Sequence, residues 1–367
     1  MKKVLCLLAA CLLVFTLAAC GDTDVVDPGG DVFELALITD IGTIDDKSFN
    51  QGSWEGLEKY AKENGITHKY YRPAEQSDGA YLTAIDLAVE GGAKVIVTPG
   101  FLFEVPIYEA QDLYPDVYFV LIDGVPNDGD WSNGFPTVKI NDNVVGINYA
   151  EDQAGFLAGY AAVMDGYRKL GFMGGMAVPA VVRFGYGFVQ GVEFAGNELG
   201  LSSGDLEVKY HYTGGFDATP EAQALAAAWY NDGTEVIFAC GGAVGNSVMA
   251  AAAAEDKKVI GVDVDQSSES PTVITSAMKG LGASVYAALK AYYDGNFPGG
   301  QNQIFDASND GVGLPQDFSR FETFDKAAYD EIYARLVAGE IPRMVDLEET
   351  GSPSVVPVQL TKVVEIA

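Results

Sequence analysis

Residues 33–65 read FELALITDIGTIDDKSFNQGSWEGLEKYAKENG, in which a short apolar run leads through a polar turn into a helical pattern. The apolar run has the length and composition of a buried strand. The helical pattern covers 48–63 and places Trp54, Leu57 and Ala61 on one face, with the charged residues elsewhere. A buried strand followed by an amphipathic helix is the unit of a parallel sheet that is covered by helices.

The same alternation continues along the chain and predicts an α/β fold. With 367 residues, the chain is long enough for two lobes of roughly 150 residues each, each with a doubly wound parallel sheet. The predicted strands are 33–39, 93–98, 117–122, 169–173, 207–212, 235–240 and 258–262, with one or two more in the Val-rich tail. The predicted helices are 48–63, 81–89, 149–164, 182–199, 220–230, 246–255, 281–293 and 329–338.

The N-terminus has the pattern of an export signal. Lys2 and Lys3 precede an apolar run at 4–15, which is shorter than the roughly 20 residues that a membrane span needs. Small residues stand directly before Cys20, as in a bacterial lipobox, so residues 1–20 are predicted to be a signal peptide whose cysteine becomes the lipidated first residue. Residues 21–31 are rich in Asp, Gly and Pro and predict a flexible tether. We therefore expect the protein on the extracytoplasmic face of the cell membrane.

Composition excludes several classes of partner and site. The net charge of −30 argues against a nucleic acid polymer, which needs a basic surface. Once the signal is removed and Cys20 is lipidated, Cys240 has no intrachain partner, and it ends an apolar run as a small buried hydrophobe would. The sequence contains no HExxH metal motif and no Walker loop, and it predicts neither a metal nor a cofactor.

Acidic side chains stand where predicted strands end. Asp40, Asp123 and Asp263 each follow an apolar run, and the ligand crevice of an open parallel sheet lies just beyond those ends. Carboxylates there are suited to accept hydrogen bonds from hydroxyl groups, as on a ribose or another sugar. The alternative is that each aspartate only caps the helix that follows it.

Two aromatic residues stand in comparable loops of the two predicted lobes. Phe49 lies in the first turn of the helix at 48–63, and Phe216 follows the strand at 207–212. One ring from each lobe could clamp a flat ligand by stacking. The alternative is that either ring fills a gap in a core.

Four motifs, in this order, resemble the basic membrane protein family of lipoproteins. They are TDIGTIDDKSFNQGSWEGL at 39–57, GGMAVPAVVRFGYGFVQG at 174–191, YTGGFD at 212–217 and GVDVDQ at 261–266. The similarity runs from Phe33 to Pro342. Members are substrate-binding components of ABC importers, and the family includes purine nucleoside receptors.

The resemblance implies a type I periplasmic-binding fold, with two lobes joined by three crossovers that close on a ligand. We expect residues 32–141 and 266–320 in the N-terminal lobe, and residues 142–265 and 321–345 in the C-terminal lobe. It also implies a monomer that binds a purine nucleoside such as inosine, guanosine or adenosine, and that delivers it to an ABC permease without catalysis.

The resemblance assigns roles residue by residue. Phe49 and Phe216 would sandwich the base, Asp40 would contact the base edge, and Asp263 would contact the ribose. The remaining ligand-binding residues that it implies are Asn50, Asp123, Gly242 and Lys279.

Two rival functions stay open. A binding protein of the same fold for a sugar or an autoinducer would keep the carboxylates but would not need two stacking rings. A dinucleotide-dependent oxidoreductase is suggested by Gly241, Gly242 and Gly245 after a strand, with Asp263 at the next strand's end. However, Cys240 occupies the position of the first glycine in that fingerprint.

Overall fold

The computed structural model describes residues 32–341, 347 and 350–366. The predicted signal peptide at 1–20, its Cys20 and the tether at 21–31 lie outside the described residues.

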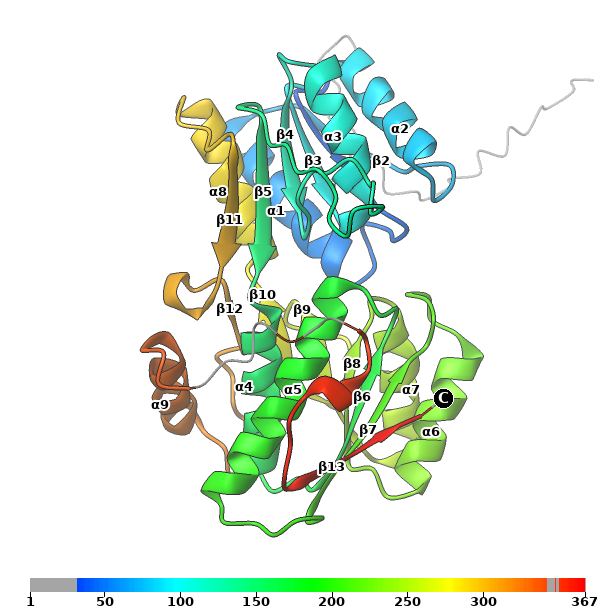
Figure 1. Ribbon diagram of the computed structural model, residues 1–367, viewed down its shortest axis with the longest axis vertical. Coiled ribbons are helices and arrows are strands. Elements are labelled where there is room, and N and C mark those ends of the chain that lie inside the picture. Colours follow the sequence, from blue (N-terminus) through cyan, green and yellow to red (C-terminus); the bar gives the residue numbers. More distant parts are fainter. Residues whose placement is uncertain (1–31, 342–346, 348–349, 367) are drawn as a thin grey trace, which may run out of the picture. The chain divides into compact units, whose positions relative to one another are not determined.

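The first lobe contains a six-stranded parallel sheet in the order β11-β5-β4-β3-β1-β2 (Figure 1). Its strands are β1 (Leu35–Ile38), β2 (His68–Tyr71), β3 (Val95–Pro99), β4 (Tyr118–Ile122), β5 (Val144–Tyr149) and β11 (Gln301–Phe305). Its helices are α1 (Phe49–Asn64), α2 (Asp78–Glu90), α3 (Glu104–Leu113) and α8 (Leu281–Tyr293), with the short helix η1 (Phe101–Phe103).

Strand β1 shows why this sheet is covered on both faces. Leu35 and Leu37 belong to one apolar core, together with Leu57 of α1. Ala36 and Ile38 point the other way into a second core. Successive strand residues face opposite sides of a sheet, so a strand that is apolar throughout requires a helical layer on each side.

The second lobe contains a seven-stranded sheet in the order β12-β10-β9-β8-β6-β7-β13, parallel except where β12 pairs with β10. Its strands are β6 (Lys169–Gly174), β7 (Leu206–Tyr212), β8 (Val236–Cys240), β9 (Lys258–Asp263), β10 (Val273–Lys279), β12 (Val312–Gly313) and β13 (Thr361–Glu365). Its helices are α4 (Glu151–Met164), α5 (Pro179–Glu198), α6 (Pro220–Asn231), α7 (Val244–Glu255) and α9 (Lys326–Val337), with η2 (Ala307–Asn309) and η3 (Pro353–Val355).

Three connections within the described residues pass between the two sheets: β5 to α4, β10 to α8, and β11 to η2. Hydrogen bonds hold these crossovers side by side. The backbone N–H of Ala150 donates to the carbonyl of Phe305 at 2.9 Å. The hydroxyls of Tyr149 and Ser284 lie 2.5 Å apart. The predicted two-lobed fold with three crossovers is therefore confirmed.

The connections lie elsewhere than the predicted lobe boundaries at 141/142, 265/266 and 320/321. Strand β5 belongs to the first sheet and β10 to the second, so the chain changes sheets at about 150, 280 and 306. The physical reason is that membership of a sheet depends on strand pairing between distant segments. A parallel strand looks the same locally in either lobe.

Helices α4 and α5 lie backbone against backbone. A Cβ added to Gly187 would lie 2.0 Å from the carbonyl oxygen of Asp152, and one added to Gly191 would lie 2.1 Å from that of Phe156. Gly155 and Gly159 of α4 face α5 equally closely. Only glycine permits the two backbones to approach so closely. This packing holds the first turns of α4 and α5 in place, and residues from these turns contribute to the site described below.

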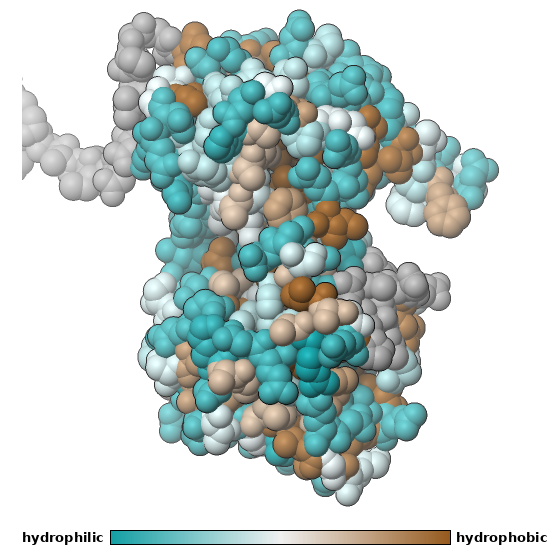
Figure 2. All heavy atoms as spheres, turned by 90° about the vertical axis from the view of Figure 1, so that its left-hand side faces the viewer, coloured by the Kyte–Doolittle hydropathy of each residue, from teal (hydrophilic) through white to brown (hydrophobic). Residues whose placement is uncertain are grey.

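The surface in Figure 2 is mainly hydrophilic, with hydrophobic residues in scattered small groups, which agrees with the strongly acidic composition. Among the described residues, no helix combines the length and the apolar character needed to cross a bilayer. Cys240 is 1% exposed and burial raises the pKa of its thiol well above the ordinary value, as expected for a structural cysteine.

Candidate functional site

A cavity of about 340 Å³ lies at the carboxyl ends of strands from both sheets, where this topology places ligands. All of the residues that we predicted for a ligand site line it: Asp40, Phe49, Asn50, Asp123, Phe216, Gly242, Asp263 and Lys279. They come from segments more than two hundred residues apart in the sequence. The structure thus brings the whole predicted set into one place.

Asp123 and Asp263 occupy equivalent positions in the two lobes. Each stands at the carboxyl end of the fourth strand of its lobe along the chain, β4 and β9. Each adopts a left-handed backbone conformation, with φ of 56° for Asp123 and 67° for Asp263. Aspartate tolerates this region better than most residues, and the chain turns there sharply as it leaves the strand.

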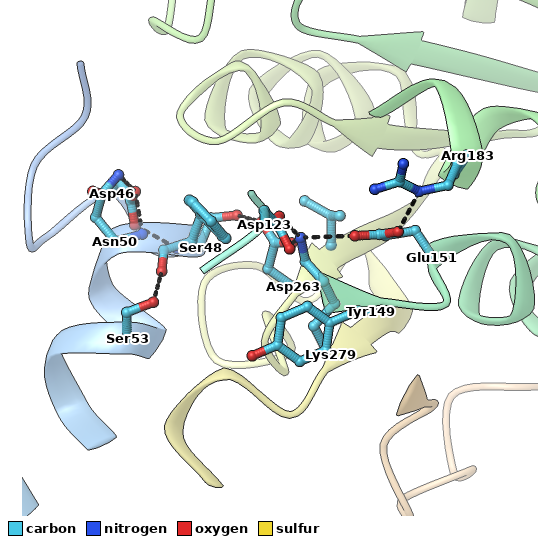
Figure 3. A network of polar contacts seen from close by, with 12 residues as sticks. Asp46, Ser48, Asn50, Ser53, Asp123, Tyr149, Glu151, Arg183, Asp263 and Lys279 are labelled. Atoms are coloured by element: carbon cyan, nitrogen blue, oxygen red, sulfur yellow. Dashed lines mark hydrogen bonds and ion pairs between the residues drawn. The ribbon is translucent and has the colours of Figure 1, made fainter. Parts of the chain in front are cut away.

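A buried ion cluster joins the two lobes around the ammonium of Lys279, at the end of β10 (Figure 3). Nζ forms an ion pair with the carboxylate of Asp123 in the first lobe. It lies 3.6 Å from carboxylate oxygens of both Asp263 and Glu151. Arg183 at the start of α5 binds the other side of Glu151 at 2.7 Å.

Burial and charge act against each other in this cluster. The side chain of Lys279 is 2% exposed, and this burial lowers the pKa of its ammonium. The negative charges of Asp123, Asp263 and Glu151 have the larger, opposite effect, so the pKa of Lys279 is raised overall. Burial raises the pKa of Asp123 to about 7 although Lys279 opposes this shift. Lys279 therefore stays charged at neutral pH. The raised pKa of Asp123 means that this carboxylate takes up a proton more readily than an ordinary aspartate, which lowers the negative charge of the cluster.

Further hydrogen bonds cross between the lobes beside this cluster. The hydroxyl of Ser48 donates to Asp263 at 2.5 Å. The amide of Gln266 donates to the backbone carbonyl of Lys47 at 2.8 Å. The start of α1 in the first lobe is therefore bound to the loop after β9 in the second.

Asp40 is held by its own lobe. Its Oδ1 accepts hydrogen bonds from the backbone N–H of Gly42 at 2.8 Å and from the amide of Asn50 at 3.0 Å. Burial raises the pKa of Asp40 to about 6 against these hydrogen bonds. Within the described part of the chain, Oδ2 of Asp40 has no hydrogen-bond or ion-pair partner, so one oxygen stays available as an acceptor.

Asn50 lines the cavity and also belongs to a hydrogen-bond network of the first lobe. Its Nδ2 donates both to Asp40 and to Asp46, and its Oδ1 accepts from the backbone N–H of Asp40 at 3.3 Å. Its amide is therefore used within the protein and orients Asp40. Asp46 accepts hydrogen bonds from the backbone N–H groups of Ser48, Asn50 and Gln51, and so caps the start of α1.

The helix-capping alternative fails for the three strand-end aspartates. Asp40 accepts hydrogen bonds from Gly42 in the following turn and from Asn50. Asp123 accepts one from Lys279, and Asp263 accepts one from Ser48. In addition, Oδ1 of Asp123 is buried without a hydrogen-bond partner among the described residues. Such an atom is costly unless another molecule satisfies it.

Each lobe contributes one aromatic ring to the cavity. Phe49 is half-buried, and the ammonium of Lys279 lies 4.7 Å from its ring centroid. Phe216 is also half-buried and its ring lies so close to Gly175 that a Cβ there would be 2.6 Å away. Both rings pack against the main hydrophobic core on one side and remain partly exposed to the cavity on the other. Gly242, with φ of 55°, lies beside Phe216 at the start of α7.

Several cavity or cluster residues were not identified from the sequence. Glu151 and Arg183 belong to the ion cluster, and Arg72 lines the cavity directly after β2. Arg183 lies inside the motif at 174–191, which could have indicated it. Arg72 had no comparable signal because β2, with the sequence HKYY, is an edge strand without an apolar run. Among the described residues, no group of His, Cys, Asp and Glu is arranged to hold a metal ion.

The family model described as ABC transporter substrate-binding protein PnrA-like matches residues 33–342. The ABC transporter nucleoside-binding protein BmpA of Lactococcus lactis subsp. cremoris is 30% identical, over 89% of this chain and 95% of the relative. Basic membrane protein D of Borreliella burgdorferi is 28% identical, over 88% of each chain.

A comparison with solved structures agrees with the architecture. An ABC transporter solute-binding protein from Aeropyrum pernix K1 has a TM-score of 0.72 at 24% identity, over 86% of this chain and 95% of that one. At this identity the likeness concerns the fold alone.

Proposed function

Since this chain belongs to the PnrA-like family of ABC transporter substrate-binding proteins, we propose that it captures a purine nucleoside between its two lobes and delivers it to an ABC permease for import. It does so as a lipid-anchored protein outside the cytoplasm and performs no bond chemistry. The observation that carries the proposal is one cavity that receives an aromatic ring and acidic side chains from each lobe.

The two rings suit a flat heteroaromatic base. Phe49 and Phe216 line the same cavity from opposite lobes, which is the arrangement that a stacking clamp requires. Stacking of a base on an aromatic side chain contributes roughly 1 to 3 kcal/mol. The cavity volume of about 340 Å³ falls in the range of small-molecule sites.

The carboxylates suit the ribose. Asp263 and the unpartnered Oδ1 of Asp123 are buried acceptors on the cavity wall, and ribose hydroxyls are donors that would satisfy them. Charge-assisted hydrogen bonds of this kind contribute roughly 1.5 to 3 kcal/mol each. Because ligand contacts come from both lobes, the ligand would favour the closed arrangement and so signal occupancy to the permease.

Isothermal titration calorimetry on the purified protein tests the ligand class. We expect inosine, guanosine or adenosine to bind with a dissociation constant on the order of micromolar or tighter, since two stacked faces and several hydrogen bonds exceed the cost of association. Cytidine and simple sugars serve as controls. Native mass spectrometry before titration detects any nucleoside that co-purifies. Heat from a sugar but from none of the nucleosides would refute the proposal.

The anchor is tested separately in a bacterial host. Replacing Cys20 with serine should abolish incorporation of labelled palmitate and move the protein from the membrane fraction to the soluble extracytoplasmic fraction, because one residue carries the lipid. Cys11→Ser, within the predicted signal peptide, is the matched control and should leave both readouts unchanged. Palmitate labelling that persists in Cys20→Ser would contradict the predicted lipidation site.

A further inference from the structure

Arg72 and Asp40 leave neighbouring strands at the same edge of the first sheet. Strands β1 and β2 are parallel, with Ile38 paired to Tyr71. The backbone N–H of Thr39 donates to the carbonyl of Tyr71 at 3.0 Å. The two strands are therefore paired up to Thr39, which precedes Asp40, and Tyr71, which precedes Arg72. Both Asp40 and Arg72 line the cavity. A carboxylate and an exposed guanidinium therefore line the same cavity from neighbouring strands.

Neither group is neutralised by the other or by the rest of the protein. Within the described part of the chain, Arg72 forms no ion pair and no side-chain hydrogen bond, although acidic residues outnumber basic ones by more than two to one. Asp40 uses Oδ1 for Gly42 and Asn50, which leaves Oδ2 free. Gly100 keeps the space beside Oδ2 open, because a Cβ there would lie 3.1 Å from this oxygen.

The two free groups have opposite hydrogen-bonding character. An ionised carboxylate only accepts hydrogen bonds, and a guanidinium only donates them. A 6-oxopurine presents an N1–H donor beside an O6 acceptor, which matches this pair. A 6-aminopurine presents the reverse, an N1 acceptor beside an N6 donor, and would place a lone pair against the carboxylate.

We propose that Asp40 and Arg72 read the six-membered edge of the base, so that the protein selects 6-oxopurine nucleosides, such as inosine and guanosine, over 6-aminopurine nucleosides. Oδ2 of Asp40 accepts N1–H, and the guanidinium of Arg72 donates to O6. The inference rests on the proposed nucleoside function and gives it a base preference. Asn50 acts as a positioning residue, because its amide directs Oδ1 of Asp40 away from the base.

Calorimetry with four nucleosides tests this preference at about pH 8, where Asp40 is ionised. We expect inosine and guanosine to bind about 10- to 100-fold more tightly than adenosine, which is the discrimination of one good bidentate contact. 1-Methylinosine, which lacks the N1–H donor, should lose as much affinity as adenosine. If adenosine or 1-methylinosine binds as tightly as inosine, the inference is wrong while the nucleoside function stands. If no nucleoside binds, the proposed function itself fails.

Two variants separate base reading from general electrostatics. Arg72→Gln should weaken inosine binding about 10-fold and change adenosine binding less than about threefold. Asp40→Asn should narrow or invert the preference, because its Oδ1 can still accept from Gly42 and Asn50 while its amide N–H now faces N1 of adenine. Arg335→Gln, at a surface ion pair with Glu198, is the control for loss of an arginine. Equal effects of Arg72→Gln on inosine and adenosine, or no effect on either, would overturn the role of Arg72.

Discussion

Replacing Lys279 with methionine should lower the free energy of unfolding by about 3 to 5 kcal/mol, which is the typical cost of removing one partner from a buried ion pair. The ammonium is 2% exposed and lies among Asp123, Glu151 and Asp263. Without it, three carboxylates share a buried site with Arg183 as the one remaining cation of the cluster. Urea denaturation followed by circular dichroism measures the change.

The pH dependence of this variant identifies the cause of its instability. Burial raises the pKa of Asp123 from 3.8 to about 7, so the stability that this group contributes is fully present below the lower value and is lost as the pH rises to the upper one. Removing Lys279 removes the opposing charge, and the deficit should therefore be largest above about pH 7 and smaller at about pH 5. A deficit that does not change with pH would indicate lost packing instead of uncompensated charge.

Lys62→Met provides the matched control. Lys62 pairs with Glu58 one helical turn away on α1, and its side chain is 56% exposed. Surface pairs of this type contribute less than about 0.5 kcal/mol. A similar loss of stability in both variants would show that the cluster at Lys279 has no special role.

Replacing Phe49 or Phe216 with alanine should weaken nucleoside binding by about 1 to 3 kcal/mol each, or roughly 5- to 150-fold. Each ring lines the cavity from a different lobe, so each should stack on one face of the base. Calorimetry on the folded variants measures the loss. Losses below about threefold for both variants would contradict the clamp and favour a sugar as the ligand.

Three further variants refine this test. Phe135 is 84% exposed and does not line the cavity, so Phe135→Ala should leave affinity unchanged. Phe49→Leu keeps apolar volume without a flat ring, and it should lose most of what Phe49→Ala loses if stacking is the interaction. Phe49 also contacts the ammonium of Lys279, so its variants need a stability measurement at the same time.

The sequence predicts which residues reach the cavity where a residue stands at a recognisable strand end. Asp40, Asp123 and Asp263 follow apolar runs, and carboxyl ends of parallel strands meet at one edge of a sheet. Their convergence on one cavity follows from that rule once the runs are identified. Phe49 and Phe216 were identified by their loops and by the family motifs. The predicted helices at 48–63, 220–230 and 281–293 agree with α1, α6 and α8 to within one residue at each end.

The prediction failed where local pattern carries no signal. Strand β2 has no fully buried residue, so neither the strand nor Arg72 after it was expected. Strand β10 contains Thr275 and Ser276 in its middle and was not recognised as a strand, which displaced a lobe boundary. Asn50 lines the cavity, but its hydrogen bonds to Asp40 and Asp46 depend on the fold of a turn and were not predicted.

The amino-acid sequence alone determined the elements of this protein, because apolar periodicity and glycine positions act within a few residues of each other. Only the tertiary structure decided which elements share a sheet, and hence that Lys279 meets Asp123 and that Ser48 meets Asp263, 215 residues away. The crossovers and strand order bring these groups together. The buried charged groups around Lys279 are stabilised by partners that are distant in the sequence. No local pattern specifies these partners, because the electrostatic interaction between them is strong only once the fold has brought them together away from water.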